Sequence, residues 1–298
     1  MRVTIGVAAL VALGVWAGAA RAADSVYWGY QYEDIEVTAA GSSEYAVRLA
    51  HNLKRFDQAL VKILHFDSPK RVPVKLYALA PRDMERLMGK DVAYAVRPYR
   101  QATLIVTSSG WGSGGGGYQG AYFGYIEGLL VSNGAEHYPP WYRYGVPMML
   151  SDVSFVGDRL TVGGVLHTWS QTIAAGVWMP IRTLLQARAH DPVVREDMFV
   201  GESWYLAREV FIEGKYRDEF LHYLALIGQG QSEADAYQAA FTVPYETFDH
   251  MLQAARSEAW HQYVMHVTDS PGSEHPVRLS TQEAQARLAL LERHEGAP

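Results

Sequence analysis

The chain has 298 residues, a net charge of −6 and no cysteine, so disulfides, thiolate metal sites and cysteine catalysis are excluded. No long basic run is present, which argues against nucleic acid as a partner. The length is enough for one large domain or two small ones with a substantial core.

The first 22 residues are typical of a secretory signal. A positive start at Arg2 is followed by an apolar run to Ala20, and Ala20-Arg21-Ala22 forms a small-x-small cleavage pattern. An uncleaved membrane anchor is the alternative, but the segment is short and ends in that pattern. We therefore expect a periplasmic or secreted protein that has no membrane span once residues 1–22 are removed.

The pattern up to residue 165 predicts mixed strands and helices. Ser43 begins a helix to about residue 64, because apolar residues recur there at helical spacing. A Gly-rich segment over 110–120 precedes an apolar helix through Asn133, and a second apolar helix starts near Gly145. Further elements are strands over 32–39, 74–79 and 103–107, a short helix ending before Gly89, and a hairpin over 153–162 that turns at Gly157-Asp158.

The remaining pattern is mainly helical, with predicted helices over 181–189, 202–212, 216–227, 232–242, 245–260 and 281–294. This order indicates an α+β fold with an N-terminal mixed sheet and helix lobe over 23–165 and a mainly helical lobe over 166–268. A cleft is expected between the two lobes. Residues 269–298 are interpreted as a linker and a charged terminal helix.

Several catalytic motifs are weak or absent. Residues 112–117 match GxGxxG in form, but no βαβ unit follows and Tyr118 replaces the lysine of a P-loop, so we interpret this segment as a connection. No His is followed by Glu, so the zinc motif HExxH is absent. Two E-x-x-H pairs allow a di-metal site, although exposed side chains explain them equally well; they are Glu219 with His222 and Glu258 with His261.

Two apolar segments carry a family resemblance. The first is Tyr122-Phe123-Gly124-Tyr125-Ile126-Glu127-Gly128-Leu129-Leu130, and the second is Trp141-Tyr142-Arg143-Tyr144-Gly145. Together with the order of elements between residues 34 and 256, they resemble the zincin-like fold of gluzincin (thermolysin-like) metallopeptidase domains in exported bacterial proteins. The resemblance implies a zinc site built by two successive helices.

The resemblance places unsuitable side chains at the catalytic positions. The two histidines of HExxH fall on Phe123 and Glu127, and the general base falls on Gly124. The third ligand, the Glu of Trp-x-x-Glu-Gly, falls on Tyr144, and a later acidic position falls on Met148. Phenylalanine cannot ligate a metal, glycine cannot take a proton, and a phenol is a poor zinc ligand at neutral pH. We expect burial to raise the pKa of Glu127, or a base such as Arg143 to pair with it.

These substitutions predict a pseudoenzyme with no catalytic residue, no metal and no cofactor. Its cleft would bind a peptide, a glycan or an envelope protein through residues such as Tyr125, Glu127, His137, Trp141 and Tyr144. One alternative is an active zinc-dependent hydrolase with displaced ligands, among them Glu136 and His137. Another is a structural component of an envelope complex whose charged terminal helix, with Glu283, Arg287, Glu292 and Arg293, docks a partner.

Overall fold

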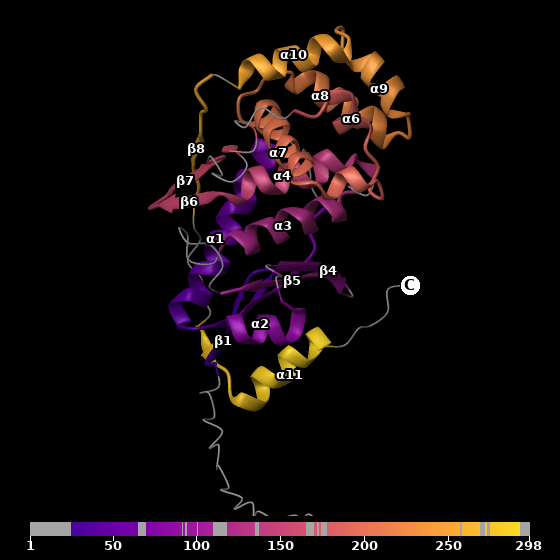
Figure 1. Ribbon diagram of the computed structural model, residues 1–298. Helices are drawn as coiled ribbons and strands as arrows, with labels where there is room; N and C mark the ends of the chain where they lie inside the picture. The colour runs from indigo at the N-terminus through magenta and orange to yellow at the C-terminus, as the bar shows by residue number, and fades with distance from the viewer. Residues whose placement is uncertain are drawn as a thin grey trace, which may run out of the picture.

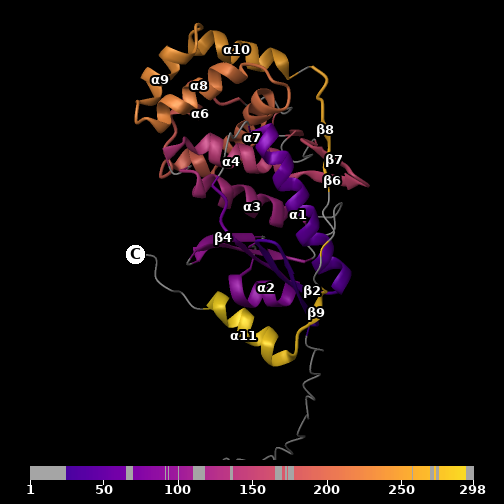
Figure 2. The ribbon, with the colours of Figure 1, turned by 180° about the vertical axis from the view of Figure 1, so that it is seen from behind.

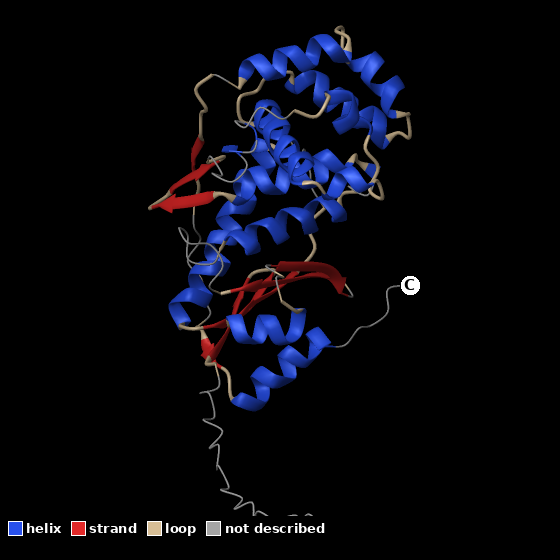
Figure 3. Ribbon diagram, viewed as in Figure 1, coloured by secondary structure: helices blue, strands red, loops and turns tan. Residues whose placement is uncertain are grey.

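The computed structural model describes residues 25–64, 70–90, 92, 94–99, 101–109, 118–134, 137–164, 170, 171, 173, 178–256, 258–268, 272, 275, 276 and 277–292. The predicted signal over 1–22 and most of the Gly-rich segment lie outside these residues. Within them the chain has the predicted α+β class, with many helices and a mixed sheet (Figure 3). Among the described helices, none combines the length and the apolar character that a bilayer crossing requires.

A six-stranded mixed sheet forms one layer of the molecule. Its strands lie in the order β4 (Tyr94–Tyr99), β5 (Ala102–Ser108), β3 (Val74–Leu79), β2 (Ile35–Ala40), β1 (Tyr27–Tyr32) and β9 (Val277–Arg278). The central strands β2, β3 and β5 are parallel, and the outer pairings are antiparallel. The strand predicted over 74–79 is confirmed. The one predicted over 32–39 corresponds to β2, which begins at Ile35 after a turn at Glu33 with a φ of 50°, and β1 was not predicted.

Helices cover both faces of this sheet. Helices α1 (Ser43–Ile63) and α3 (Gln119–Ser132) lie on one face, and α2 (Pro81–Met88) and α11 (Thr281–Glu292) lie on the other (Figures 1 and 2). Alternate residues of a strand point to opposite faces, so Leu104 and Val106 of β5 pack toward α2 and α11 while Ile105 packs toward α3. Strand β9 and α11 thus complete this layer from the C-terminal end of the chain.

Helix α1 follows from its sequence pattern. Its N-cap is Ser42, one residue before the predicted Ser43, and the Ser42 hydroxyl oxygen accepts a hydrogen bond from the Tyr45 amide at 3.2 Å. The buried apolar face repeats at helical spacing and packs on the sheet; it comprises Ala46, Leu49, Ala50, Leu53, Phe56, Ala59, Leu60 and Ile63.

The second half stacks further helices above α3 (Figure 1). These are α4 (Pro140–Ser151), α6 (Ile181–Gln186), a 3-10 turn (Pro192–Arg195), α7 (Asp197–Phe211), α8 (Arg217–Gly228), α9 (Glu233–Ala240) and α10 (Tyr245–Ala255). Helix α4 begins five residues earlier than Gly145, because Pro140 suits the first helical position. Helix α10 ends at Ala255 rather than residue 260.

A small antiparallel sheet flanks the helices. Strands β6 (Val153–Val156) and β7 (Arg159–Val162) form the predicted hairpin, which turns at Gly157 with a φ of 61°. Strand β8 (Tyr263–His266) pairs with β7 across about a hundred residues of sequence and was not predicted. The apolar side of this sheet reaches the main core through Leu160 and Val162.

Candidate functional site

Helices α3 and α4 bring together the positions that the resemblance assigns to zinc ligands. Phe123 and Glu127 lie one turn apart on α3, and the Phe123 ring centroid is 4.4 Å from that of Tyr94 on β4. Burial raises the pKa of Tyr94, and the charges of Glu127 and Tyr144 add to this shift, so both groups lie within electrostatic range of Tyr94. We call Tyr94, Phe123, Glu127 and Tyr144 the central cluster.

The central cluster is half-buried and holds one carboxylate. Burial raises the pKa of Glu127, and the nearby positive charge of Arg143 opposes this effect, as expected from the sequence. Burial also raises the pKa of the Tyr94 phenol above its ordinary value. Tyr144 is 40 % exposed, and its ring lies edge-on to Phe199 of α7 at 6.2 Å. The cluster therefore exposes the Tyr144 ring and part of Tyr94 beside one carboxylate, while Phe123 is buried.

Two glycines of α3 face the sheet at very short range. A Cβ atom on Gly124 would lie 2.6 Å from Cγ2 of Ile105 and 3.0 Å from Cγ2 of Val96. One turn later, a Cβ atom on Gly128 would lie 2.5 Å from Cγ2 of Thr103. The position that the resemblance gives to the general base therefore has no room for a side chain in this packing.

A third glycine sets the crossing of α4 and α7. A Cβ atom on Gly145 would lie 2.1 Å from the carbonyl oxygen of Ser203. This glycine belongs to the Trp-x-x-x-Gly segment that carries the resemblance, where it allows two helix backbones to touch. The segment therefore has a packing role that needs no catalytic group.

The other predicted binding residues do not join the central cluster. Trp141 is fully buried, with its ring 5.3 Å from that of Phe220, so the structure places it in the core instead of on a binding surface. Tyr125 is also buried, and its burial, together with the nearby charge of Asp57 on α1, raises its pKa. His137 is exposed beyond the end of α3.

The described residues contain no group of three or more His, Cys, Asp or Glu side chains arranged to hold a metal ion. Glu136, a ligand candidate in the hydrolase alternative, lies outside the described residues. The E-x-x-H pairs do not meet: Glu219 and His222 are exposed on α8, and residues 258 and 261 follow the end of α10. Glu258 pairs with Lys215 at 2.8 Å.

Helix α7 carries buried charged groups that sequence reasoning did not single out. Glu202 is 1 % exposed and accepts a hydrogen bond from the Met179 amide at 2.5 Å, while its other oxygen has no partner within the described residues. Burial raises the pKa of Glu202 to about 8. Arg208 is fully buried and pairs with Glu213 at 3.0 Å. These groups lie in the helical layer away from the central cluster.

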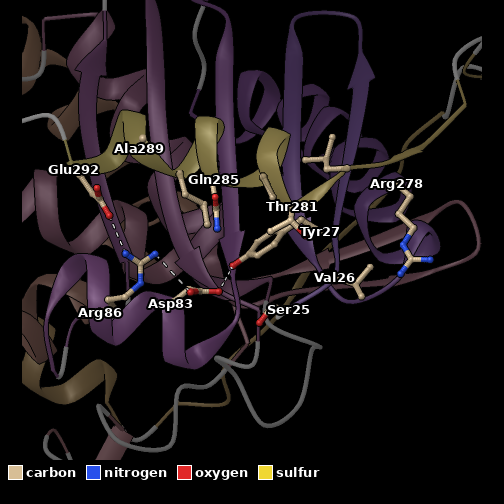
Figure 4. A pocket seen from close by; sticks show the side chains of 13 residues that line it. Ser25, Val26, Tyr27, Asp83, Arg86, Arg278, Thr281, Gln285, Ala289 and Glu292 are labelled. Carbon is tan, nitrogen blue, oxygen red and sulfur yellow. Dashed lines mark hydrogen bonds and ion pairs between the residues drawn. The ribbon is translucent and has the colours of Figure 1, made fainter. Parts of the chain in front are cut away.

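A cavity of about 570 Å³ lies between α2, α11 and the start of β1 (Figure 4). The polar side chains that line it contact one another. Tyr27 donates a hydrogen bond to Asp83 at 2.7 Å, and Arg86 forms an ion pair with Glu292 at 2.8 Å. Its walls come from three segments far apart in the chain, residues 25–27, α2 and 278–292, so local sequence patterns do not indicate it.

Two charged residues of α11 make contacts within the chain. Arg287 donates a hydrogen bond to Thr38 and pairs with Glu36 of β2 at 3.1 Å. Glu283 accepts hydrogen bonds from Ser280 at the start of the helix. Arg293 lies outside the described residues. Docking of a partner by this helix stays a prediction.

Comparison of the chain with protein-family models and with curated protein sequences gives no match. The likeness to gluzincins therefore depends on the residues of α3 and α4 and on the order of elements between residues 34 and 256.

Proposed function

We propose that this protein is an exported, non-catalytic relative of gluzincin-type peptidases that binds an extended peptide beside the central cluster. The observation that carries the proposal is the packing of Gly124 against Ile105 and Val96. It leaves the expected position of the general base without a side chain or the space for one. Phe123 and Tyr144 occupy ligand positions beside it, so Glu127 is the one carboxylate of the cluster.

Strand β4 supports a peptide as the ligand. Within the described residues it pairs with β5 alone, so it is an edge strand of the sheet, the place where an extended peptide can be added as a further strand. Tyr94 lies on this strand and packs on the buried Phe123, and the exposed ring of Tyr144 lies within electrostatic range of it. An extended peptide would gain main-chain hydrogen bonds from β4 and apolar contacts from the cluster.

The test has a binding arm and a catalytic arm. A synthetic library of random decapeptides is equilibrated with the purified protein, and retained peptides are measured singly by calorimetry. We expect micromolar binding that Tyr144→Ala weakens about tenfold and that backbone N-methylation of the peptide abolishes. Tyr263→Ala on the distant strand β8 is the matched control and should leave binding unchanged.

The catalytic arm offers the same peptides to protein that was stripped of metal and then given zinc. The proposal predicts intact peptides. Hydrolysis that a chelator stops would favour the hydrolase alternative instead, and a library from which no peptide binds would contradict the proposed ligand.

A further inference from the structure

An open cavity of about 730 Å³ lies between the first half of α1, the β6–β7 turn and Pro276. None of its lining residues belongs to the central cluster. One face of α1 supplies most of the wall, at helical spacing, through Glu44, Val47, Arg48, His51, Asn52 and Arg55. Phe155 and Gly157 of the hairpin form the opposite wall. We call this space the arginine cavity.

Arg55 is the unusual residue of this wall. Its side chain is buried with 8 % of the residue exposed, and its guanidinium carbon lies 4.6 Å from the ring centroid of Phe155. One terminal nitrogen donates to the Gly157 carbonyl, and the other is at the outer limit of a hydrogen bond to Asn52, at 3.5 Å. The Nε atom is buried and has no hydrogen-bond partner within the described residues.

No carboxylate of the described residues forms an ion pair with Arg55. Asp57, two residues along α1, pairs with Arg71 at 2.8 Å. Asp158, in the hairpin turn, is exposed and pairs with His266 at 2.9 Å. His266 lowers the pKa of Asp158, and the charge of Arg55 makes a smaller contribution in the same direction.

Arg208, the other buried arginine of the described residues, differs from Arg55 in having a carboxylate partner. Arg208 is fully buried, more deeply than Arg55, and Glu213 compensates its charge at 3.0 Å. A guanidinium cannot lose its proton in a protein, so Arg55 keeps its charge despite its burial. A buried charge without a partner is costly, and an anion from solution would remove that cost.

Arg48 adds a second positive charge to the same face of α1. It stands two turns before Arg55 and is exposed, so it can reach a ligand in the open part of the cavity. Its charge is felt by Glu44, which lies at the first turn of the helix. Two guanidinium groups with one amide, Asn52, make a donor set suited to the oxygens of a phosphate, sulfate or carboxylate.

We propose that the arginine cavity binds a small organic anion. Its charged group lies at Arg48 and Arg55, and its apolar part contacts Val47, Phe155 and Pro276. The volume is that of a site for a small organic molecule, which is more space than a bare inorganic ion needs.

The test is calorimetric titration of the full-length secreted form with phenyl phosphate, phenyl sulfate, benzoate and inorganic phosphate, at fixed low ionic strength. We expect at least one aromatic anion to bind one site with a Kd below about 1 mM and more tightly than inorganic phosphate. Arg48→Gln should weaken that binding about fivefold or more. Arg82→Gln, an exposed arginine on α2, is the matched control and should bind as the wild type does.

Arg55 also ties the hairpin to α1, so its replacement can disturb the fold. For this reason the decisive variant is Arg48→Gln, whose thermal midpoint should equal that of the wild type without ligand and rise less with it. Absence of saturable binding of every anion would overturn the proposal. An equal loss of affinity in Arg48→Gln and Arg82→Gln would do so too, because it would indicate unspecific charge attraction.

Discussion

The central cluster and the arginine cavity are built in opposite ways. In the central cluster, α3 lies so close to the sheet that Gly124 and Gly128 leave no room for side chains. In the arginine cavity, Arg55 is buried beside open space and no described carboxylate compensates it. The first region is defined by close packing that leaves no space for a larger side chain. The second region has open space beside a buried charge.

The largest expected effect is at Gly145, where α4 crosses α7 at short range. Gly145→Ala would place Cβ 2.1 Å from the Ser203 carbonyl oxygen, and backbone cannot move aside as a side chain can. We expect a loss of about 3 kcal/mol or more in the free energy of unfolding, measured with urea. Gly228→Ala on α8, where the nearest atom would be 3.7 Å away, is the control and should be nearly neutral. Equal stability of the two variants would refute the close crossing.

Glu202 differs from Arg55 in its response to burial. A buried carboxyl group can bind a proton and become neutral, whereas a guanidinium keeps its charge. Burial raises the pKa of Glu202 from 4.5 to about 8. Between these values the folded chain binds more protons here than the unfolded chain, so stability falls as pH rises and levels off above pH 8.

Glu202→Gln should remove this dependence while its side-chain oxygen still accepts from the Met179 amide. From pH 5 to pH 8.5 the wild type should lose roughly 2–4 kcal/mol more than the variant in urea unfolding. Parallel pH profiles of the two proteins would contradict the buried, protonated acid.

A smaller effect is expected where α3 meets the sheet. Gly124→Ala brings Cβ within 2.6 Å of Ile105 Cγ2, and the gain in helix propensity offsets part of the strain. The net loss should be about 1 kcal/mol in urea unfolding. Ile105→Ala removes the closer of the two obstructing methyl groups, so in that background Gly124→Ala should cost less, although Val96 Cγ2 still lies 3.0 Å from the new Cβ. An additive double variant would show that the two residues do not touch.

Local patterns predicted much of the fold. Strand β3 and the hairpin at Gly157 follow from alternation and turn chemistry within a few residues. Strand β4 was missed because Arg97 and Pro98 interrupt its pattern, which an edge strand tolerates. Strands β8 and β9 were missed because each is set by pairing with a distant strand.

The candidate sites also combine features that local sequence indicates with features that contacts between distant segments decide. The resemblance picked out Phe123 and Glu127, which lie one turn apart on α3, and the structure brings Glu127 and Tyr144 within electrostatic range of Tyr94. The tight contact at Gly124 depends on how α3 lies on β5, which the sequence of α3 does not encode by itself. The sequence pattern of α1 indicates a solvent-exposed position for Arg55. It is buried because Phe155 and Gly157, about a hundred residues later in the chain, cover it.

The most direct test of the central claim counts zinc atoms per chain after stripping and dialysis against excess zinc, by elemental analysis. Wild-type protein should retain no stoichiometric zinc. The triple variant Phe123→His, Glu127→His, Tyr144→Glu should retain about one zinc per chain and remain inactive, because Gly124 still supplies no base. One zinc per wild-type chain, or none in a folded triple variant, would contradict a peptidase frame that has lost its ligands.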